Sequence, residues 1–222
     1  MSKLSIIKSM LLIVCFAFFI NENCFAGAWT ANQGSMYQKL SANFYYADER
    51  FDKDGDKVDF SDNGEFTDNN ISYYGEYGIL DSLTVIGSFS YKWLKDETDY
   101  VRSKTNGFSD MELGLKYRLL SGQGNVLSVQ GLVKIPEFYD EDDDPALGNS
   151  QYDTEIRFLY GQSLYPTVPG YFNIEAGYRF RAEAPADELR YLIEIGLDFT
   201  EHAYGRIKLD GIYGMNNEGS GS

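Results

Sequence analysis

The sequence contains one histidine and two cysteines among its 222 residues. A metal centre rich in histidine and a catalytic Cys–His pair are therefore not expected. Basic residues are also scarce: 19 Lys and Arg stand against 34 Asp and Glu, a net charge of -15. That balance argues against nucleic acid as a partner, because phosphate binding needs clustered Lys and Arg. Proline is rare, with 5 residues beside 22 Gly, 18 Tyr and 15 Phe, a composition that does not suit disorder, collagen or a coiled coil.

Long apolar runs are absent, and the one uninterrupted stretch covers residues 10–20. It is too short to cross a bilayer as a helix, which needs about 20 residues. Lys3 and Lys8 precede it, and a stretch ending at Ala26 follows. This order predicts a secretory signal peptide over residues 1–26. Cys15 and Cys24 both lie within it, so the predicted mature chain contains no cysteine and forms no disulfide.

Beyond the signal peptide, apolar and polar residues alternate with a period of two, which predicts β-strands. The alternation is clearest in 107–119, 171–181 and 189–199. Most of the segments are about ten residues long, the length a tilted strand needs to cross a membrane. The sequence therefore predicts an all-β fold, an antiparallel transmembrane β-barrel of the outer-membrane type. Nine strands are predicted, at 35–46, 70–79, 83–93, 107–119, 126–136, 152–160, 171–181, 189–199 and 205–213.

The connections between these strands are short and long in turn. The short ones are 80–82, 121–125, 161–170 and 200–204. The long ones (47–68, 94–106, 137–151 and 182–188) hold 21 acidic and 6 basic residues, a net charge of -15. Outer-membrane barrels have short periplasmic turns and longer outside loops, so this alternation favours a barrel in the outer membrane.

Charged residues gather on one face of the predicted strands, and the other face carries none. The apolar face, which includes Leu113, Leu115, Ile174, Ile193, Ile195 and Leu197, is expected to meet lipid. A soluble, lipocalin-like barrel with its faces reversed is the alternative interpretation. In the membrane form the charged face lines the pore and can form a ladder of ion pairs between strands. The residues expected to line the pore are Lys39, Glu76, Lys92, Asp110, Glu112, Lys116, Arg118, Lys134, Asp153, Glu155, Arg157, Glu175, Arg179, Arg181, Arg190, Glu194, Asp198, Arg206, Lys208 and Asp210.

An odd number of strands does not close a single-chain bacterial barrel, because these barrels use even numbers. Residues 214–222 are a polar run rich in Gly, Ser and Asn, with no strand after them. We therefore expect residues 27–222 to form an outer-membrane barrel whose C-terminal closing strand or strands are missing. The full-length protein is expected to have 10 or 12 strands.

Several short motifs occur in a familiar order along the mature chain. They are GAWT at 27–30, RFD at 50–52, YGEYG at 74–78, GFSDMELGLKYR at 107–118, PALG at 145–148, EAGYR at 175–179 and APADELR at 184–190. This series resembles the proteobacterial outer-membrane family labelled "MetA-pathway of phenol degradation", including its XagA-like members. The resemblance implies an outer-membrane channel associated with aromatic catabolism, and it implies no catalytic residues.

Three groups of polar residues are candidates for further chemistry. Asp52, Asp54 and Asp56 look like the start of a calcium loop, but position 57 is Lys where such a loop needs Gly, so a solvated loop is favoured. His202, the single histidine, falls in a short turn. Asp110 and Glu112 are expected to form salt bridges with Lys116 or Arg118. We therefore predict neither enzymatic activity nor a cofactor.

The functional prediction is a narrow channel or transporter for small solutes, aromatic ones among them, with a weak preference for cations. The alternative is a barrel-anchored surface, adhesion or structural protein that acts through its acidic loops. The expected location is the outer membrane. The expected partners are outer-membrane lipid and lipopolysaccharide, the barrel-assembly machinery and a small-molecule solute.

Overall fold

The computed structural model describes residues 14–16, 27–51, 55–182, 187–200 and 203–215. Most of the predicted signal peptide, Asp52, Asp54, His202 and residues 216–222 lie outside this description. The described part is all-β, with one short 3-10 turn. Its elements are β1 (Val14–Phe16), β2 (Met36–Ala47), β3 (Glu49–Phe51), β4 (Lys57–Asp59), η1 (Ser61–Asn63), β5 (Glu65–Leu80), β6 (Leu83–Glu97), β7 (Arg102–Phe108), β8 (Met111–Ser121), β9 (Asn125–Ile135), β10 (Asp153–Ser163), β11 (Gly170–Arg181), β12 (Glu188–Thr200) and β13 (Ala203–Gly214).

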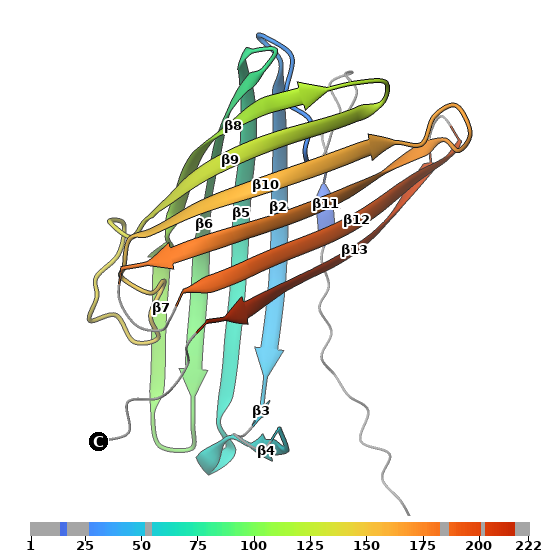
Figure 1. Cartoon of the computed structure of the whole chain (residues 1–222). Coiled ribbons are helices and arrows are strands. Elements are labelled where there is room, and N and C mark those ends of the chain that lie inside the picture. Colours follow the sequence, from blue (N-terminus) through green and yellow to red (C-terminus); the bar gives the residue numbers. More distant parts are fainter. Residues whose placement is uncertain (1–13, 17–26, 52–54, 183–186, 201–202, 216–222) are drawn as a thin grey trace, which may run out of the picture.

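One antiparallel sheet contains nearly all of these strands, and it is curled into a half-barrel (Figure 1). Its order is β1-β2-β5-β6-β8-β9-β10-β11-β12-β13, so neighbours in space follow one another along the chain. β7 also pairs with β6, and β3 and β4 form a separate hairpin. β2 and β13 do not pair with each other in the described part of the chain, and β1 pairs with β2 over three residues.

The all-β, antiparallel prediction is confirmed. The predicted strands correspond to β2, β5, β6 and β8 to β13, each within a few residues of its expected bounds. The alternation of apolar and polar residues located these strands, because the side chains of a strand point alternately to the two faces of the sheet.

Two predictions about individual segments are wrong. The predicted strand 107–119 is interrupted at Ser109 and Asp110, where the backbone passes from β7 to β8. The predicted loop 94–106 is mostly strand, because β6 continues to Glu97 and pairs with β7 as far as Arg102. This hairpin carries charged residues on both faces, so its sequence looks like that of a solvated loop. In the structure, Glu97 forms ion pairs with Lys95 and Arg102.

Burial identifies which face of the sheet lies inside the curl. Lys116 is 1% exposed and Glu155 4% exposed, whereas Leu115 and Phe158 on the opposite face are each 52% exposed. The polar side chains therefore occupy the inner face and the apolar side chains the outer one. The predicted apolar face follows this pattern, with five of its residues exposed and Leu197 half-buried. No helix in the described residues is long and apolar enough to cross a membrane.

The two ends of the half-barrel differ in their connections. The turns β5–β6, β8–β9 and β10–β11 lie at one end, toward the top and right of Figure 1. The opposite end carries the long connections: the β3–β4 hairpin with η1, the β6–β7 hairpin and the segment between β9 and β10 (Figure 1). We call these the short-turn end and the long-loop end.

Candidate functional site

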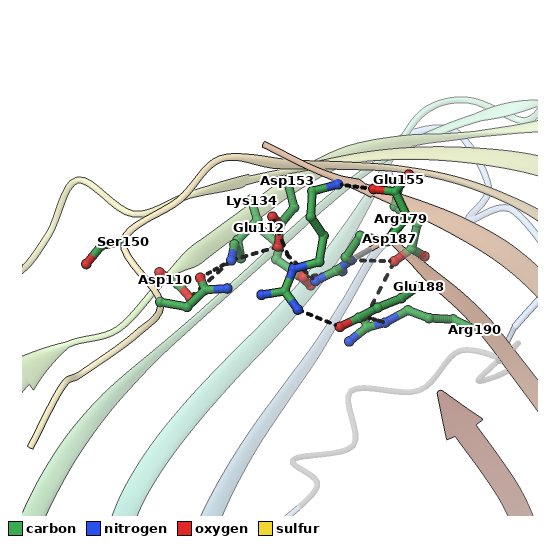
Figure 2. A network of polar contacts seen from close by, with 12 residues as sticks. Asp110, Glu112, Lys134, Ser150, Asp153, Glu155, Arg179, Asp187, Glu188 and Arg190 are labelled. Atoms are coloured by element: carbon green, nitrogen blue, oxygen red, sulfur yellow. Dashed lines mark hydrogen bonds and ion pairs between the residues drawn. The ribbon is translucent and has the colours of Figure 1, made fainter. Parts of the chain in front are cut away.

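The inner face carries a continuous network of ion pairs toward the long-loop end, shown in Figure 2. Arg179 of β11 lies at its centre. Its Nη2 atom is 2.6 Å from Glu112 Oε1 of β8, and its Nε atom donates to Glu155 Oε2 of β10 at 2.9 Å. All three side chains project from different strands toward the same space. The network therefore connects strands that are not direct neighbours.

Further pairs extend the network on both sides of Arg179. On one side, Lys134 Nζ lies 2.7 Å from Asp153 Oδ2 and 3.7 Å from Asp110 Oδ2. On the other side, Arg190 Nε lies 3.1 Å from Glu188 Oε2, and Arg181 Nη1 lies 2.9 Å from Glu188 Oε1. Opposite charges thus alternate from β8 to β12.

Toward the middle of the sheet, Arg157 joins two carboxylates. Its guanidinium lies 2.5 Å from Glu155 Oε1 and 2.7 Å from Glu175 Oε2. The amide of Asn173 donates to the other oxygen of Glu175 at 2.8 Å. Each carboxylate here accepts more than one charged or polar donor, which compensates its removal from water.

A separate buried pair lies toward the short-turn end. Lys116 Nζ is 3.0 Å from Glu76 Oε2, and the hydroxyl of Tyr74 donates to Glu76 Oε1 at 2.5 Å. Glu194 accepts from the hydroxyl of Tyr171 at 2.6 Å and lies 3.9 Å from Arg206.

The ion-pair partners expected for Asp110 and Glu112 are wrong. Glu112 pairs with Arg179, Asp110 with Lys134, and Lys116 with Glu76. Two residues four apart on one strand lie about 13 Å from each other, whereas residues opposite each other on adjacent strands lie about 5 Å apart. The ion pairs of Asp110, Glu112 and Lys116 therefore run across strands.

Most of the predicted inner-face residues form ion pairs. Asp198 instead accepts a hydrogen bond from the hydroxyl of Tyr165 at 2.8 Å. Lys39, Lys92 and Arg118 make no ion pair within the described residues. The residues in ion pairs are Glu76, Asp110, Glu112, Lys116, Lys134, Asp153, Glu155, Arg157, Glu175, Arg179, Arg181, Arg190, Glu194, Arg206, Lys208 and Asp210.

Facing the charged strands, β2, β5 and β6 present small hydroxyl and amide side chains. Asn43 donates to Asn70 Oδ1 at 2.7 Å and to Ser72 Oγ at 3.0 Å. Ser41, Ser72, Ser88 and Ser90 border a cavity of about 390 Å³, together with Glu112 and Arg179 from the charged side. We call these four serines the hydroxyl wall.

A second cavity of about 270 Å³ lies beside the first. Both cavities are bordered by Tyr74, Ser88 and Glu112, so they follow one another along the inner face. The second adds an apolar patch of Ile86, Leu132, Leu159 and Leu192, and it is also bordered by Gly27. We call the first the outer cavity and the second the inner cavity.

The segment between β9 and β10 folds back over the long-loop end, which the sequence did not predict. Leu147 is buried, and its carbonyl accepts a hydrogen bond from Ser109 Oγ at 2.6 Å. The hydroxyl of Tyr139 donates to Asp110 Oδ1 at 2.6 Å and accepts from the Ser150 backbone N–H at 2.7 Å. Burial and the bond to Asp110 raise the pKa of the Tyr139 hydroxyl. This segment therefore lies against Asp110, which borders the outer cavity.

Comparison with known proteins gives no assignment. No protein-family model, no curated protein and no solved structure matches the chain. The candidate site consequently rests on the geometry of the inner face alone.

In the part of the chain that the structure describes, no group of three or more His, Cys, Asp or Glu side chains could hold a metal ion. Of the calcium-loop candidates, Asp56 is exposed, while Asp52 and Asp54 lie outside the described residues.

Sequence reasoning also missed the segment 27–33, which lies inside the curl. Ala28 is fully buried and packs with Val126 and Leu159 of the inner face, with Trp29 against them. The only signal in the sequence was a tryptophan among small residues directly after the predicted cleavage site.

Proposed function

We propose that the chain forms an outer-membrane β-barrel with a narrow passage for small solutes. The observation that carries this proposal is the distribution of polarity across the sheet. The inner face buries most of the ion pairs and contains two adjoining cavities, while Leu113, Ile156 and Ile193 stay exposed on the outer face. A soluble barrel exposes its polar face, whereas a barrel in lipid exposes its apolar face.

The dimensions of the cavities support small cargo. The outer cavity, of about 390 Å³, lies near the lower end of the roughly 300–1,000 Å³ typical of small-molecule sites, and the inner cavity, of about 270 Å³, lies just below it. Hydroxyl groups on one side and paired charges on the other offer hydrogen bonds without a strong net field. The resemblance of the sequence to the phenol-degradation family supports organic solutes, aromatic ones among them.

Two measurements test this proposal together. Membrane fractionation should recover the processed protein with the outer membrane. Purified protein in planar bilayers should give small, discrete conductance steps. Recovery of processed protein free in the periplasm would instead support the soluble barrel with reversed faces.

The competing function is a surface or adhesion role in which the acidic loops bind a partner. The run 140–144 is mostly exposed at the long-loop end, with Asp140, Glu141, Asp142 and Asp144 all exposed. If the membrane-inserted protein gives no conductance, and deletion of 140–144 abolishes attachment to a surface or partner, the adhesion function replaces the passage.

A further inference from the structure

The segment 27–33 crosses the inner face near the short-turn end. The backbone N–H of Ala28 donates to Asn173 Oδ1 at 3.1 Å, and the Ala28 carbonyl accepts from Ser128 Oγ at 2.5 Å. The Gly27 carbonyl accepts from Lys116 Nζ at 2.9 Å. Three inner-face side chains, from β8, β9 and β11, thus bind the backbone of this one segment.

The other part of the segment reaches the β5–β6 turn. Thr30 Oγ1 donates to the Asp81 carbonyl at 2.6 Å, and the Ala31 N–H donates to Thr84 Oγ1 at 2.9 Å. The Gln33 N–H donates to Asp81 Oδ1 at 2.9 Å. The segment therefore extends from the border of the inner cavity to the β5–β6 turn.

The sheet is shaped to receive this segment. A Cβ at Gly161 would lie 2.5 Å from the ring of Trp29, and a Cβ at Gly78 would lie 2.1 Å from the Asn32 carbonyl oxygen. The ring of Trp29 also meets Tyr171 edge-on, with centroids 5.9 Å apart. A larger residue at Gly78 would meet backbone, which cannot rotate away as the end of a side chain can.

The attachment differs from that of a strand. Residues 27–33 lie before β2 and form no ladder with a neighbouring strand. Their bonds to the inner face join side chains to backbone, and the first backbone pairing with β5 comes at Gly34, whose N–H donates to the Gly78 carbonyl at 2.8 Å. Gly34 has a φ of +80°, which glycine adopts without strain. The segment can therefore leave while β2 stays paired.

We propose that residues 27–33 are a plug that closes the short-turn end of the passage, and that solute leaves the inner cavity only when the plug moves. This inference rests on the proposed function, because a plug gates only where a passage exists. The side chains that hold it are Asn173, Ser128, Lys116 and Thr84.

Conductance of purified protein in planar bilayers is the first test. Deletion of residues 28–33 should raise the single-channel conductance several-fold, and Gly78→Ala should raise the fraction of time spent open. Gly131→Ala is the matched control, since a Cβ there meets nothing within 4 Å, and it should behave like the parent. Equal conductance in the parent, the deletion and Gly78→Ala would overturn the plug while the passage stands.

A thiol measurement gives a second readout that does not depend on conductance. Ser128 is fully buried beneath Ala28, and the predicted mature chain has no other cysteine, so Ser128→Cys places one thiol under the plug. Its reaction with a charged, water-soluble methanethiosulfonate should be slow, and several-fold faster when 28–33 are deleted. Ser90→Cys, at the outer cavity, should react at the same rate in both backgrounds.

The two readouts separate the possible failures. Faster labelling together with higher conductance supports the plug. Faster labelling with unchanged conductance means that the segment covers Ser128 without gating, and the inference fails. Unchanged labelling also overturns it. Faster labelling with no conductance in any variant overturns the passage and the gate together.

Discussion

At the scale of single residues, the inner face achieves burial of charge by giving each carboxylate several donors. Glu155 is 4% exposed and contacts Arg157, Arg179 and Arg190. Removing an ion from water costs several kcal/mol unless close partners replace the lost hydration. The many contacts therefore permit a charged interior at Glu155. They also predict that breaking one pair is more harmful than removing both charges.

The Lys116–Glu76 pair provides the cleanest test. Lys116→Met leaves Glu76 buried without its cation and should lower the free energy of unfolding by about 3 kcal/mol. The double variant Lys116→Met/Glu76→Gln keeps an acceptor for Tyr74 and should recover the part of that loss that comes from the unpaired charge, whereas the bond from Lys116 to the Gly27 carbonyl is lost in both variants. Urea unfolding of the four proteins in a double-mutant cycle measures both effects. Additive losses in the double variant would show that the pair contributes no coupling.

Tyr139 is expected to hold the segment between β9 and β10 against Asp110, at the border of the outer cavity. Tyr139→Phe removes the hydrogen bonds to Asp110 and Ser150, which should cost about 1 kcal/mol and free the segment. A protease that cleaves after acidic residues should then cut the run 140–144 several-fold faster. Tyr165→Phe is the matched control, because it removes a similar bond, to Asp198, from a turn at the other end.

The stabilisation that the Tyr139 hydroxyl gives to this segment should be lost only as the pH rises. The pKa of the Tyr139 hydroxyl is raised in the folded protein, so folding favours its neutral form. The stabilisation is complete below the ordinary tyrosine pKa of about 10 and is lost as the pH rises through the higher folded value. Faster proteolysis of the segment should therefore begin only in strongly alkaline solution. An increase at neutral pH would contradict the assignment.

At the scale of strands, alternation in the sequence predicted which elements form and which face is polar. In β12, Tyr191, Ile193 and Ile195 point outward while Glu194 points inward, as the period of two requires. Ion-pair partners could not be predicted, because they depend on the register between strands and on the curl that brings Arg179 to Glu112. The plug could not be predicted either, since Ala28 is held through its backbone, which every sequence shares.

The outer face of the strands should meet lipid. Leu115→Arg and Ile195→Arg place a charge on exposed apolar positions and should each destabilise the inserted protein by about 2–4 kcal/mol near the middle of the bilayer. Ser90→Arg, which borders the outer cavity, should cost much less because water is available there. Unfolding from lipid vesicles compares the three. Equal stability for Leu115→Arg and the parent would reverse the assignment of faces.

At the scale of the whole molecule, β2 and β13 lie toward opposite edges of the half-barrel and do not pair with each other in the described part of the chain. In lipid every backbone N–H and C=O must find a partner, so a spanning form requires both edges to be paired. β1 pairs with Ala42, Ser41 and Leu40 of β2. Because β1 belongs to the predicted signal peptide, cleavage would return that edge of β2 to an unpaired state.

Ion selectivity tests how charge is divided between the loops and the interior. The four predicted connections hold a net charge of -15, and within a Debye length of roughly 8 Å at 0.15 M salt they concentrate cations at the mouth. Arg179, Arg181 and Arg190 could have formed an anion site near this end, but each lies within 3.1 Å of a carboxylate. The interior therefore should not reverse the bias of the mouth, and reversal potentials under a salt gradient should show weak cation preference.

Neutralising the run 140–144 by Asp→Asn and Glu→Gln changes should reduce that preference. Replacing Lys39, which forms no ion pair with a described residue, by Gln should increase it, since Lys39 borders the outer cavity. Clear anion selectivity of the parent at low salt would contradict control by the mouth charges.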